Sequence, residues 1–403
     1  MRIVMLNQFF WPDAVATSQV LTDVACALAE SHEVVIICGR SKRTKRNSDR
    51  NLGSGISVIR TRAFGFGHGT LSRVASYLSF LAGAVFHGVR LGRPDVYVTL
   101  TTPPLLPVLG SLLSRLHGVR HVIWEMDVYP DIATEVGYLK KDGWIDRLSC
   151  TIINWSRRHA DAVIALGHDM KARLQSHGIS AGKIRVVENW ADGLKITPMP
   201  FPDGPLIIQY SGNFGLAHEA ATITRVIERL QHHPDIKFLF VGGGSRRPPL
   251  MTLCKSQGIP NVEFRDFCDH SELGKSLSES HLGLVTQLPN TVGCVVPSKI
   301  YGIMAAGRPL LFIGPSKSTP AEHIRLSGCG WHIEPGDVDG LEQLLLFLNS
   351  NRNIITEAGV KARSAFDRSF HRAIGVAQIM GILGSDAQVD GIAAKFGESV
   401  LGD

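Results

Sequence analysis

The residues between Pro297 and Pro309 have the types and the spacing to bind a phosphate group. Pro297 can close one segment, Ser298 can cap a helix, and Gly307 and Pro309 end that helix and begin the next strand. The first turn of such a helix exposes free N–H groups and a partial positive charge, and Lys299 adds a full charge beside them. The spacing fits a diphosphate site and a capped core helix with a solvated lysine equally well.

Two glycine-rich runs follow predicted strands. Gly212-Asn213-Phe214-Gly215 follows LIIQY, and Gly242-Gly243-Gly244-Ser245 follows FLFV. Glycine lets a ligand approach the backbone closely, although tight turns between strands and helices also use it. Neither run matches the dinucleotide-binding G-x-G-x-x-G pattern or the P-loop, which weakens a dehydrogenase or ATPase interpretation.

Two acidic residues follow a predicted strand in the first half of the chain. Asp127 comes just after HVIWE, and Glu125 lies two residues before it. The carboxyl ends of parallel strands face the ligand side of a sheet, so the Asp127 carboxylate is expected where a substrate binds. It could accept or position the proton of an acceptor hydroxyl, or it could cap the next turn. Glu125 is the alternative candidate, on the same face if the strand continues.

Alternating strands and helices must position these residues. We expect strands at 2–6, 33–38, 57–61, 95–100, 121–124 and 162–165, and again at 206–210, 237–241, 262–264, 282–286 and 309–313. Strands separated by helices indicate parallel sheets covered on both faces. The fold class is therefore α/β, with two Rossmann-like, doubly wound domains facing a cleft.

The length of 403 residues favours two domains over one. Prolines and glycines crowd the stretch from 189 to 205, which is typical of a linker. We predict a first domain over 1–190, a linker over 191–205, a second domain over 206–384 and a flexible tail over 385–403.

The two halves differ in charge. Residues 1–190 hold 23 Lys and Arg against 15 Asp and Glu, whereas the whole chain holds 42 against 36. A basic first half predicts an anionic partner, such as a lipid diphosphate or an acidic membrane surface. The densest basic cluster, from Arg40 to Arg50, lacks interleaved aromatic residues that stack on bases, so we expect no nucleic-acid partner.

The seven cysteines are scattered without a CxxC pair, which argues against a zinc site and favours a reducing compartment. The first residues form too short an apolar run for a signal peptide. The apolar stretches 74–89 and 103–113 are interrupted or too short to span a bilayer. We expect a cytoplasmic protein that can lie on the inner face of a membrane without crossing it.

Three segments of the second half are together similar to the donor domain of family 4 GT-B glycosyltransferases. They are Tyr210-Ser211-Gly212-Asn213, Gly242-Gly243-Gly244, and Pro297-Ser298-Lys299 with Ala305-Ala306-Gly307-Arg308-Pro309. The stretches 8–13 (QFFWPD) and 124–131 (WEMDVYPD) resemble the O-antigen and capsule subgroup, including its fucosamine-transferase-like members. The resemblance covers nearly the whole chain in the right order.

The resemblance implies that the second domain binds a UDP- or GDP-sugar. The implied donor residues are Gly212, Asn213, Gly243, Gly244, Ser298, Lys299 and Tyr301, with the loops after Val241 and around 265–267 bordering the base. In the first domain, the loop 8–18, with Trp11, Asp13 and Ser18, would line the acceptor side.

Two departures from the family pattern affect the donor site. Many members carry two glutamates eight residues apart, and Cys294 and Gly302 stand at the equivalent positions. The loop after Tyr210 lacks the usual Arg and Lys pair, so Lys299, or Arg246 and its neighbour, would have to neutralise the diphosphate. No D-x-D motif stands at a strand end. We therefore expect no cofactor and no metal, with helix-end amides and Lys299 in their place.

The resemblance also implies transfer with retention at the anomeric carbon, to a saccharide on a polyprenyl diphosphate. In that reaction the leaving diphosphate can itself take the acceptor's proton. Two alternatives stay open. A sugar-nucleotide 2-epimerase of the same fold would turn over without an acceptor, and a non-catalytic partner of an active transferase would explain the missing glutamates.

Overall fold

The computed structural model describes residues 1–13, 15–40, 52, 54–62 and 70–384. The chain divides into two compact units. Unit 1 holds Met1–Glu188 and the C-terminal segment from Ala373, and unit 2 holds Asn189–Arg372. In the described residues no helix is both long and apolar enough to cross a membrane.

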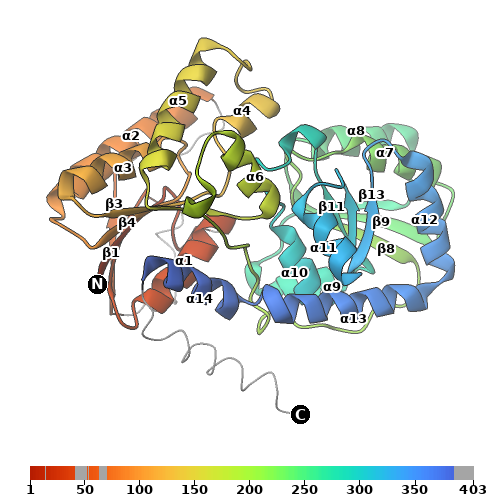
Figure 1. Ribbon diagram of the computed structural model, residues 1–403. Helices are drawn as coiled ribbons and strands as arrows, with labels where there is room; N and C mark the ends of the chain where they lie inside the picture. Colours follow the sequence, from red (N-terminus) through yellow and green to blue (C-terminus); the bar gives the residue numbers. More distant parts are fainter. Residues whose placement is uncertain (14, 41–51, 53, 63–69, 385–403) are drawn as a thin grey trace. The chain divides into compact units, whose positions relative to one another are not determined.

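Unit 1 is built on a parallel sheet of seven strands, in the order β3-β2-β1-β4-β5-β6-β7 (Figure 1). The strands are β1 (Arg2–Leu6), β2 (Glu33–Cys38), β3 (Ile56–Arg60), β4 (Val96–Thr99), β5 (Arg120–Trp124), β6 (Ala162–Ala165) and β7 (Ile184–Val186). The helices are α1 (Ala16–Leu28), α2 (Thr70–Arg90), α3 (Leu106–His117), α4 (Asp131–Glu135), α5 (Trp144–His159), α6 (His168–Ser176) and α14 (Arg372–Leu383).

The central strands of unit 1 read as continuous apolar runs because helices cover both faces of the sheet. Helices α2, α3 and α5 lie on one face, and α1 and α14 lie on the other (Figure 1). Phe80 of α2 and Leu113 of α3 pack with Val4 and Leu6 of β1 in one buried cluster. This packing fixes the strand ends from which the loops of the site emerge.

Unit 2 has a parallel sheet of six strands in the order β10-β9-β8-β11-β12-β13. The strands are β8 (Leu206–Asn213), β9 (Ile236–Gly243), β10 (Val262–Arg265), β11 (Leu282–Thr286), β12 (Leu310–Ile313) and β13 (Gly330–Ile333). The helices are α7 (Ala221–Arg229), α8 (Arg247–Gln257), α9 (Leu273–Ser278), α10 (Lys299–Ala305), α11 (Thr319–Ser327), α12 (Val338–Ser350) and α13 (Arg352–Ser369).

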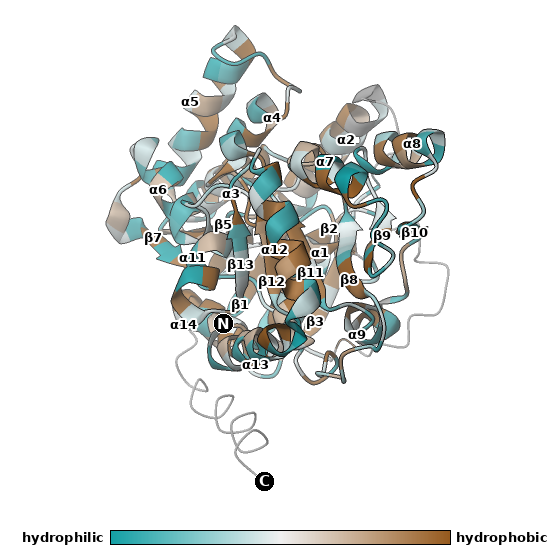
Figure 2. Cartoon of the chain, turned by 90° about the vertical axis from the view of Figure 1, so that its right-hand side faces the viewer, coloured by the Kyte–Doolittle hydropathy of each residue, from teal (hydrophilic) through white to brown (hydrophobic). Residues whose placement is uncertain are grey.

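Two hydrophobic clusters enclose the sheet of unit 2. One joins the strands to α7, α8 and α12, and the other joins them to α9, α10, α11 and α13. Helix α12 is drawn largely in the hydrophobic colour in Figure 2, and its Leu341, Leu345 and Leu348 are fully buried. Their spacing of three and four residues places them on one face of the helix.

The division of the chain differs from the predicted one at its C-terminal end. Helix α14 belongs to unit 1, although the predicted second domain extended to residue 384. The Arg120 guanidinium donates to the carbonyls of Ile382, at 3.1 Å, and Leu383, at 3.4 Å. These are the carbonyls that a helix leaves unpaired at its C-terminus, so the guanidinium caps α14.

The predicted linker is fixed to unit 2. The buried Arg308 guanidinium donates to the carbonyls of Met199, Pro200 and Ser278 at 2.9–3.0 Å, and it lies over the ring of Phe201. The proline-rich composition therefore marks the start of a new unit. The predicted tail over 385–403 lies outside the described residues.

Each sheet has one place where the order of its strands reverses. In unit 1 the reversal lies between β1 and β4, and in unit 2 it lies between β8 and β11. The connections that leave these strands run to opposite faces of the sheet, which opens a crevice at their carboxyl ends.

Candidate functional site

In unit 2 the pairing of β8 and β9 continues into the two glycine runs. The register continues to Asn213 opposite Gly243, and the Phe214 amide donates to the Gly243 carbonyl at 2.7 Å. A Cβ at Gly242 would lie 2.2 Å from the Gly212 carbonyl oxygen, and one at Gly244 would lie 2.3 Å from that of Phe214. These two glycines are required by the approach of the two backbones, so Gly244 has a structural reason of its own.

Gly212 and Gly243 face other groups. A Cβ at Gly212 would lie 3.8 Å from Cε of Lys299, and one at Gly243 would lie 3.1 Å from the ring of Phe267. The Phe267 side chain is 65% exposed, and that of Asn213 is also exposed. The backbone at the end of β8 therefore carries a cation on one side, and the end of β9 carries an exposed aromatic ring.

Lys299 is held by an aromatic residue from the neighbouring strand. Its Nζ donates to the hydroxyl of Tyr210 and lies 3.8 Å from the centre of the tyrosine ring. Tyr210 is 1% exposed and lies in β8, three residues before Asn213. Lysine side chains have many rotamers, so this contact defines where the cation stands.

His218 completes the contact from the other side. Its Nδ1 lies 2.8 Å from the Thr286 carbonyl, and its Nε2 lies 3.2 Å from the Tyr210 hydroxyl. A carbonyl only accepts, so Nδ1 carries the proton and Nε2 of the neutral ring is an acceptor for the tyrosine O–H. The same O–H donates to the Asn213 carbonyl at 2.9 Å, so its single proton is shared between that carbonyl and Nε2. The hydroxyl oxygen accepts from Lys299.

Burial sets the protonation of this cluster. It lowers the pKa of Lys299 to about 7. It also lowers the pKa of His218 to about 3, with the charge of Lys299 acting in the same direction. Within the described residues no salt bridge joins Lys299 to a carboxylate. A buried cation without a counter-charge is costly, and an anionic ligand would relieve that cost.

The structure places Ser298 and Tyr301 in surroundings that differ from those of Lys299. Ser298 precedes α10 without a side-chain cap, and α10 has only seven residues. Tyr301 is fully buried, with its ring 5.2 Å from that of Phe370, so the prediction that it binds the donor is corrected. Two residues after Lys299, a helix has turned by about 200°, which directs Tyr301 to the opposite face.

Arg246 lies partly buried beside the same turn. Its amide donates to the Phe214 carbonyl at 2.9 Å, and its charge contributes to lowering the pKa of His218. Its neighbour Arg247 pairs with Asp266 at 2.9 Å. Of these two arginines, Arg246 is therefore the one whose charge acts on the His218 side of the cluster.

In unit 1 the Asp127 carboxyl group lies at the carboxyl end of β5. The amides of Met126 and Asp127 donate to the Thr101 hydroxyl oxygen at 3.1 and 3.2 Å, which joins this loop to the one after β4. Burial, followed by the charge of Glu125, raises the pKa of Asp127 to about 6. A carboxyl group with this pKa can exchange a proton near neutral pH.

Glu125 has a different role from the predicted catalytic one. It is fully buried and forms an ion pair with Arg157, with Oε1 2.6 Å from Nε and Oε2 3.1 Å from Nη2. Arg157 also donates to the Tyr129 carbonyl and to Asn154. Strand β5 ends at Trp124, so the alternation that would put Glu125 and Asp127 on one face does not continue. We correct the prediction: Glu125 anchors the loop.

The three acceptor-side candidates follow β1. Trp11 and Asp13 are partly exposed, and Arg60 donates to the Trp11 carbonyl. Ser18 is fully buried on the inner face of α1, so its predicted place on the acceptor surface is corrected. The Gln8 amide donates to the Thr102 carbonyl at 2.9 Å, which brings the loops after β1 and β4 together.

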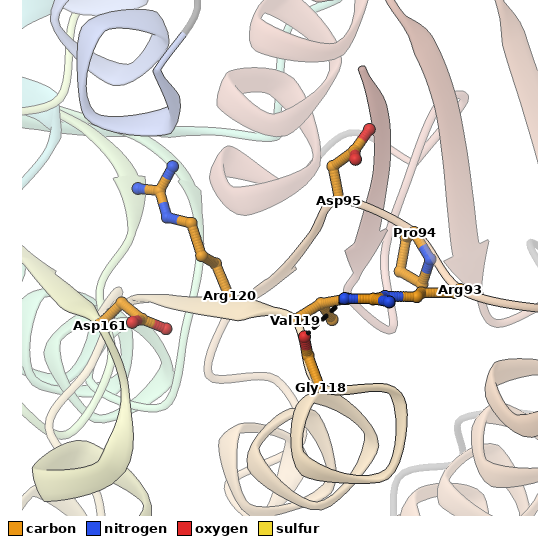
Figure 3. A pocket seen from close by; sticks show the side chains of 7 residues that line it. All are labelled: Arg93, Pro94, Asp95, Gly118, Val119, Arg120 and Asp161. Atoms are coloured by element: carbon orange, nitrogen blue, oxygen red, sulfur yellow. Dashed lines mark hydrogen bonds between the residues drawn. The ribbon is translucent and has the colours of Figure 1, made fainter.

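A separate pocket lies at the opposite, amino edge of the same sheet (Figure 3). It is lined by Arg93, Pro94, Asp95, Gly118, Val119, Arg120 and Asp161. Arg93 donates to the Gly118 carbonyl, Arg120 caps α14, and Asp161 accepts from the His121 amide at 2.8 Å. The backbone already satisfies these charged groups, and we assign the pocket no ligand.

Two predictions on partners stay as predictions. In the part of the chain that the structure describes, no group of three or more His, Cys, Asp or Glu side chains is placed to hold a metal ion. Arg40 is exposed, whereas the rest of the basic cluster up to Arg50 lies outside the described residues.

Residues 16–190 match the model of the glycosyl transferase 4-like domain. WbjE of Pseudomonas aeruginosa, described as a glycosyltransferase, is 26% identical over 64% of this chain and 66% of its own length, just under two thirds. WcaI of Escherichia coli K12, described as a colanic acid biosynthesis glycosyl transferase, is 26% identical over 70% of this chain and 74% of its own.

Among solved structures, Anabaena Alr3699/HepE in complex with UDP superposes with a TM-score of 0.69 at 15% identity, over 96% of this chain and all of that chain. At this identity the likeness concerns the fold. It confirms the predicted GT-B architecture of two doubly wound α/β units. The matched domain and the two sequence relatives agree with the predicted enzyme class.

Sequence reasoning missed Tyr210 and Thr101. A tyrosine inside LIIQY and a threonine after DVYVTL are typical of strand residues. The position of Tyr210 two residues before the glycine run was the available signal, but its contact with Lys299 spans 89 residues.

Proposed function

We propose that this glycosyltransferase of the GT-B fold transfers a sugar from a UDP-sugar to a lipid-linked saccharide. One observation carries the proposal. Lys299 is a partly buried cation without a carboxylate partner in the described residues, and it lies beside the exposed backbone where the strand order of the second sheet reverses. A diphosphate supplies the missing negative charge.

The donor diphosphate is proposed to bind between Lys299 and the turn at Gly212 and Asn213. Tyr210 and His218 position the lysine, and they are neutral, so they do not compete with the ligand for its charge. As the bond to the sugar breaks, negative charge grows on the leaving phosphate, and a fixed cation in a water-poor site stabilises it. The proposal therefore assigns to Lys299 the charge that an Arg and Lys pair supplies in many members of the family.

The base is proposed to stack on Phe267. An aromatic ring that is 65% exposed beside the glycines of β9 offers an apolar face, and base–aromatic stacking contributes about 1–3 kcal/mol. The UDP bound by the Anabaena protein of the same fold supports uridine as the base. The ordinary alternative, a GDP-sugar, is distinguished by direct competition between the two nucleotides.

The acceptor hydroxyl is proposed to be oriented by Asp127, with retention at the anomeric carbon. In that mechanism the leaving diphosphate accepts the proton, so Asp127 acts by positioning. We expect Asp127→Asn to lower the transfer rate by about a hundredfold. Donor hydrolysis without acceptor should change little, because the substitution leaves the donor half-site intact. The exposed Asp142→Asn is the matched control.

Surface polysaccharide is the proposed context. WcaI is described in colanic acid biosynthesis, and the O-antigen and capsule resemblance points to the same kind of acceptor. A saccharide on a polyprenyl diphosphate is held in the bilayer, so we propose that the enzyme works at the inner membrane surface, attached peripherally.

The deciding experiment is a thermal-shift and calorimetric panel of UDP, GDP and their sugars. UDP at a hundred times its dissociation constant should stabilise the protein by about 2.7 kcal/mol. Lys299→Met should abolish the shift, and the exposed Lys317→Met should retain it. Binding to neither nucleotide would remove the proposal. If the protein converted the UDP-sugar to an epimer without an acceptor, a sugar-nucleotide 2-epimerase would replace the transferase as the proposed function.

A further inference from the structure

Helix α2 is apolar on both of its faces. Phe80 and Ala84 are fully buried against the sheet, whereas Leu78 is 60% exposed and Phe86 is 49% exposed. Val74, Val85 and Val89 lie on the same outward stripe and are also exposed. A helix that is hydrophobic all round is normally enclosed by protein or lipid. The outward apolar stripe of α2 is therefore expected to contact a partner outside this unit's core.

The same pattern continues on the two neighbouring helices. Helix α3 packs against both α2 and α5, so the three form one layer (Figure 1). Leu112 and Leu116 are exposed on α3, and Trp144, Leu148 and Ile152 follow one another at helical spacing on the outside of α5. We call the outward surfaces of α2, α3 and α5 the basic apolar face.

The charges on this face have one sign. The residues of α2, α3 and α5 include a single acidic side chain, Asp146, and it is buried. Arg90, Arg115 and Arg147 are exposed. The Arg90 guanidinium lies 4.1 Å from the centre of the Phe86 ring. Long basic side chains that lie along apolar surface with their charged ends free are typical of a membrane interface.

We propose that the basic apolar face docks unit 1 on an anionic phospholipid bilayer. Exposed leucine, phenylalanine and tryptophan side chains would enter the boundary between head groups and acyl chains, and the arginines would contact lipid phosphates. A second copy of the chain fits poorly, because two such faces would bring arginines together without exposed acids to pair them. The proposal rests on the proposed function in one respect: a lipid-linked acceptor gives the enzyme a reason to bind a membrane.

Vesicle flotation of the full chain tests the proposal. Vesicles of phosphatidylcholine with 30% phosphatidylglycerol should bind the protein, 0.5 M salt should weaken binding, and phosphatidylcholine alone should bind it much less. The triple substitution Leu78→Ser, Phe86→Ser and Leu116→Ser should lower partitioning more than tenfold. Its matched control, Leu326→Ser, Phe347→Ser and Val360→Ser, changes exposed residues of unit 2 and should bind as the wild type does.

A charge series separates electrostatic from apolar attachment. Arg115→Glu with Arg147→Glu should weaken binding to the anionic vesicles by at least about five-fold per arginine, whereas Arg325→Glu with Arg368→Glu should not. Absent vesicle binding, or equal loss in the unit 2 controls, would overturn the proposal. The proposal would also be overturned if sedimentation showed that the wild type is a dimer and that the triple serine variant is a monomer.

The outcome is independent of the donor site. UDP affinity of the triple serine variant should equal that of the wild type. If the wild type binds no nucleotide while the vesicles still bind it through α2, α3 and α5, the proposed function fails and the docking face stands.

Discussion

The buried Arg157 of unit 1 and the partly buried Lys299 of unit 2 are cations whose surroundings differ. Arg157 of unit 1 meets a carboxylate at 2.6 Å and two further oxygen acceptors. Among the residues that the structure describes, Lys299 of unit 2 meets a tyrosine hydroxyl and the face of its ring, with no carboxylate in an ion pair. Both lie at the carboxyl edge of a parallel sheet. The difference separates a charge that the fold has neutralised from one that we propose is neutralised by a ligand.

The comparison teaches how to distinguish a structural charge from a functional one. A buried ion pair with all its hydrogen bonds made holds its loop in place and has little capacity left for a substrate. A buried cation held by neutral groups keeps its charge available. Burial lowers the pKa of Lys299 to about 7, which reflects the cost of a cation without a counter-charge, and a bound anion would raise that pKa again.

The largest effect is expected at the neutralised charge. Arg157→Met should lower the free energy of unfolding by about 3–5 kcal/mol, because it leaves Glu125 buried without a partner. Chemical denaturation of unit 1 measures it. The double variant Arg157→Met with Glu125→Gln should recover part of the loss. Unchanged stability in the single variant would break the contrast between the two cations.

The free cation should affect chemistry instead of stability. Lys299→Met should lower kcat/KM for transfer by about 10²- to 10³-fold, since a fixed charge on the leaving group is lost. The free energy of unfolding should stay the same or rise, because no paired charge is left behind. Steady-state kinetics and denaturation are measured on the same preparation, with Lys317→Met as the control. A large loss of stability would assign Lys299 a structural role.

The third effect is a pH dependence. Above pH 7 the free enzyme loses the Lys299 proton, and UDP must restore it, so affinity falls as pH rises. With a pKa of about 7, the dissociation constant should increase about five-fold from pH 7 to pH 8. Calorimetry in buffers of different ionisation enthalpy should show proton uptake at pH 8. Lys299→Arg should bind with a flat profile over this range.

The sign for stability is the reverse. The Lys299 pKa is lower in the folded than in the unfolded chain, so the unfolded state binds more protons above pH 7. The ligand-free wild type should therefore gain stability relative to Lys299→Met between pH 7 and about pH 10. A constant difference between the two proteins over that window would contradict the assigned pKa direction.

An effect of similar size to the pH dependence is expected at Tyr210, which positions Lys299. Tyr210→Phe keeps the ring over Lys299 and removes the hydroxyl, so UDP affinity should fall about 3- to 10-fold, as for one hydrogen bond. The midpoint of the pH profile should also shift, which a purely structural loss would not cause. Tyr138→Phe, on an exposed tyrosine of unit 1, is the matched control.

Much of the architecture could be predicted from the sequence. Apolar runs such as EVVIIC, separated by helical stretches, determine two parallel sheets, because a strand buried on both faces must be apolar throughout. The glycine at 242 and the start of a helix after Pro297 were also readable, since local backbone geometry demands those residues. Lys299 could be named as a candidate for the same reason.

The tertiary structure decided which candidates share a site. Ser18 and Tyr301 face inward, and Glu125 forms an ion pair with Arg157. The direction of a side chain depends on where its helix or strand begins and ends, which residue spacing alone does not reveal. Helix α14 joins unit 1 through the carbonyls that Arg120 caps, more than 260 residues away. The sequence by itself determines elements because their causes are local, and partners depend on contacts between segments far apart in the chain.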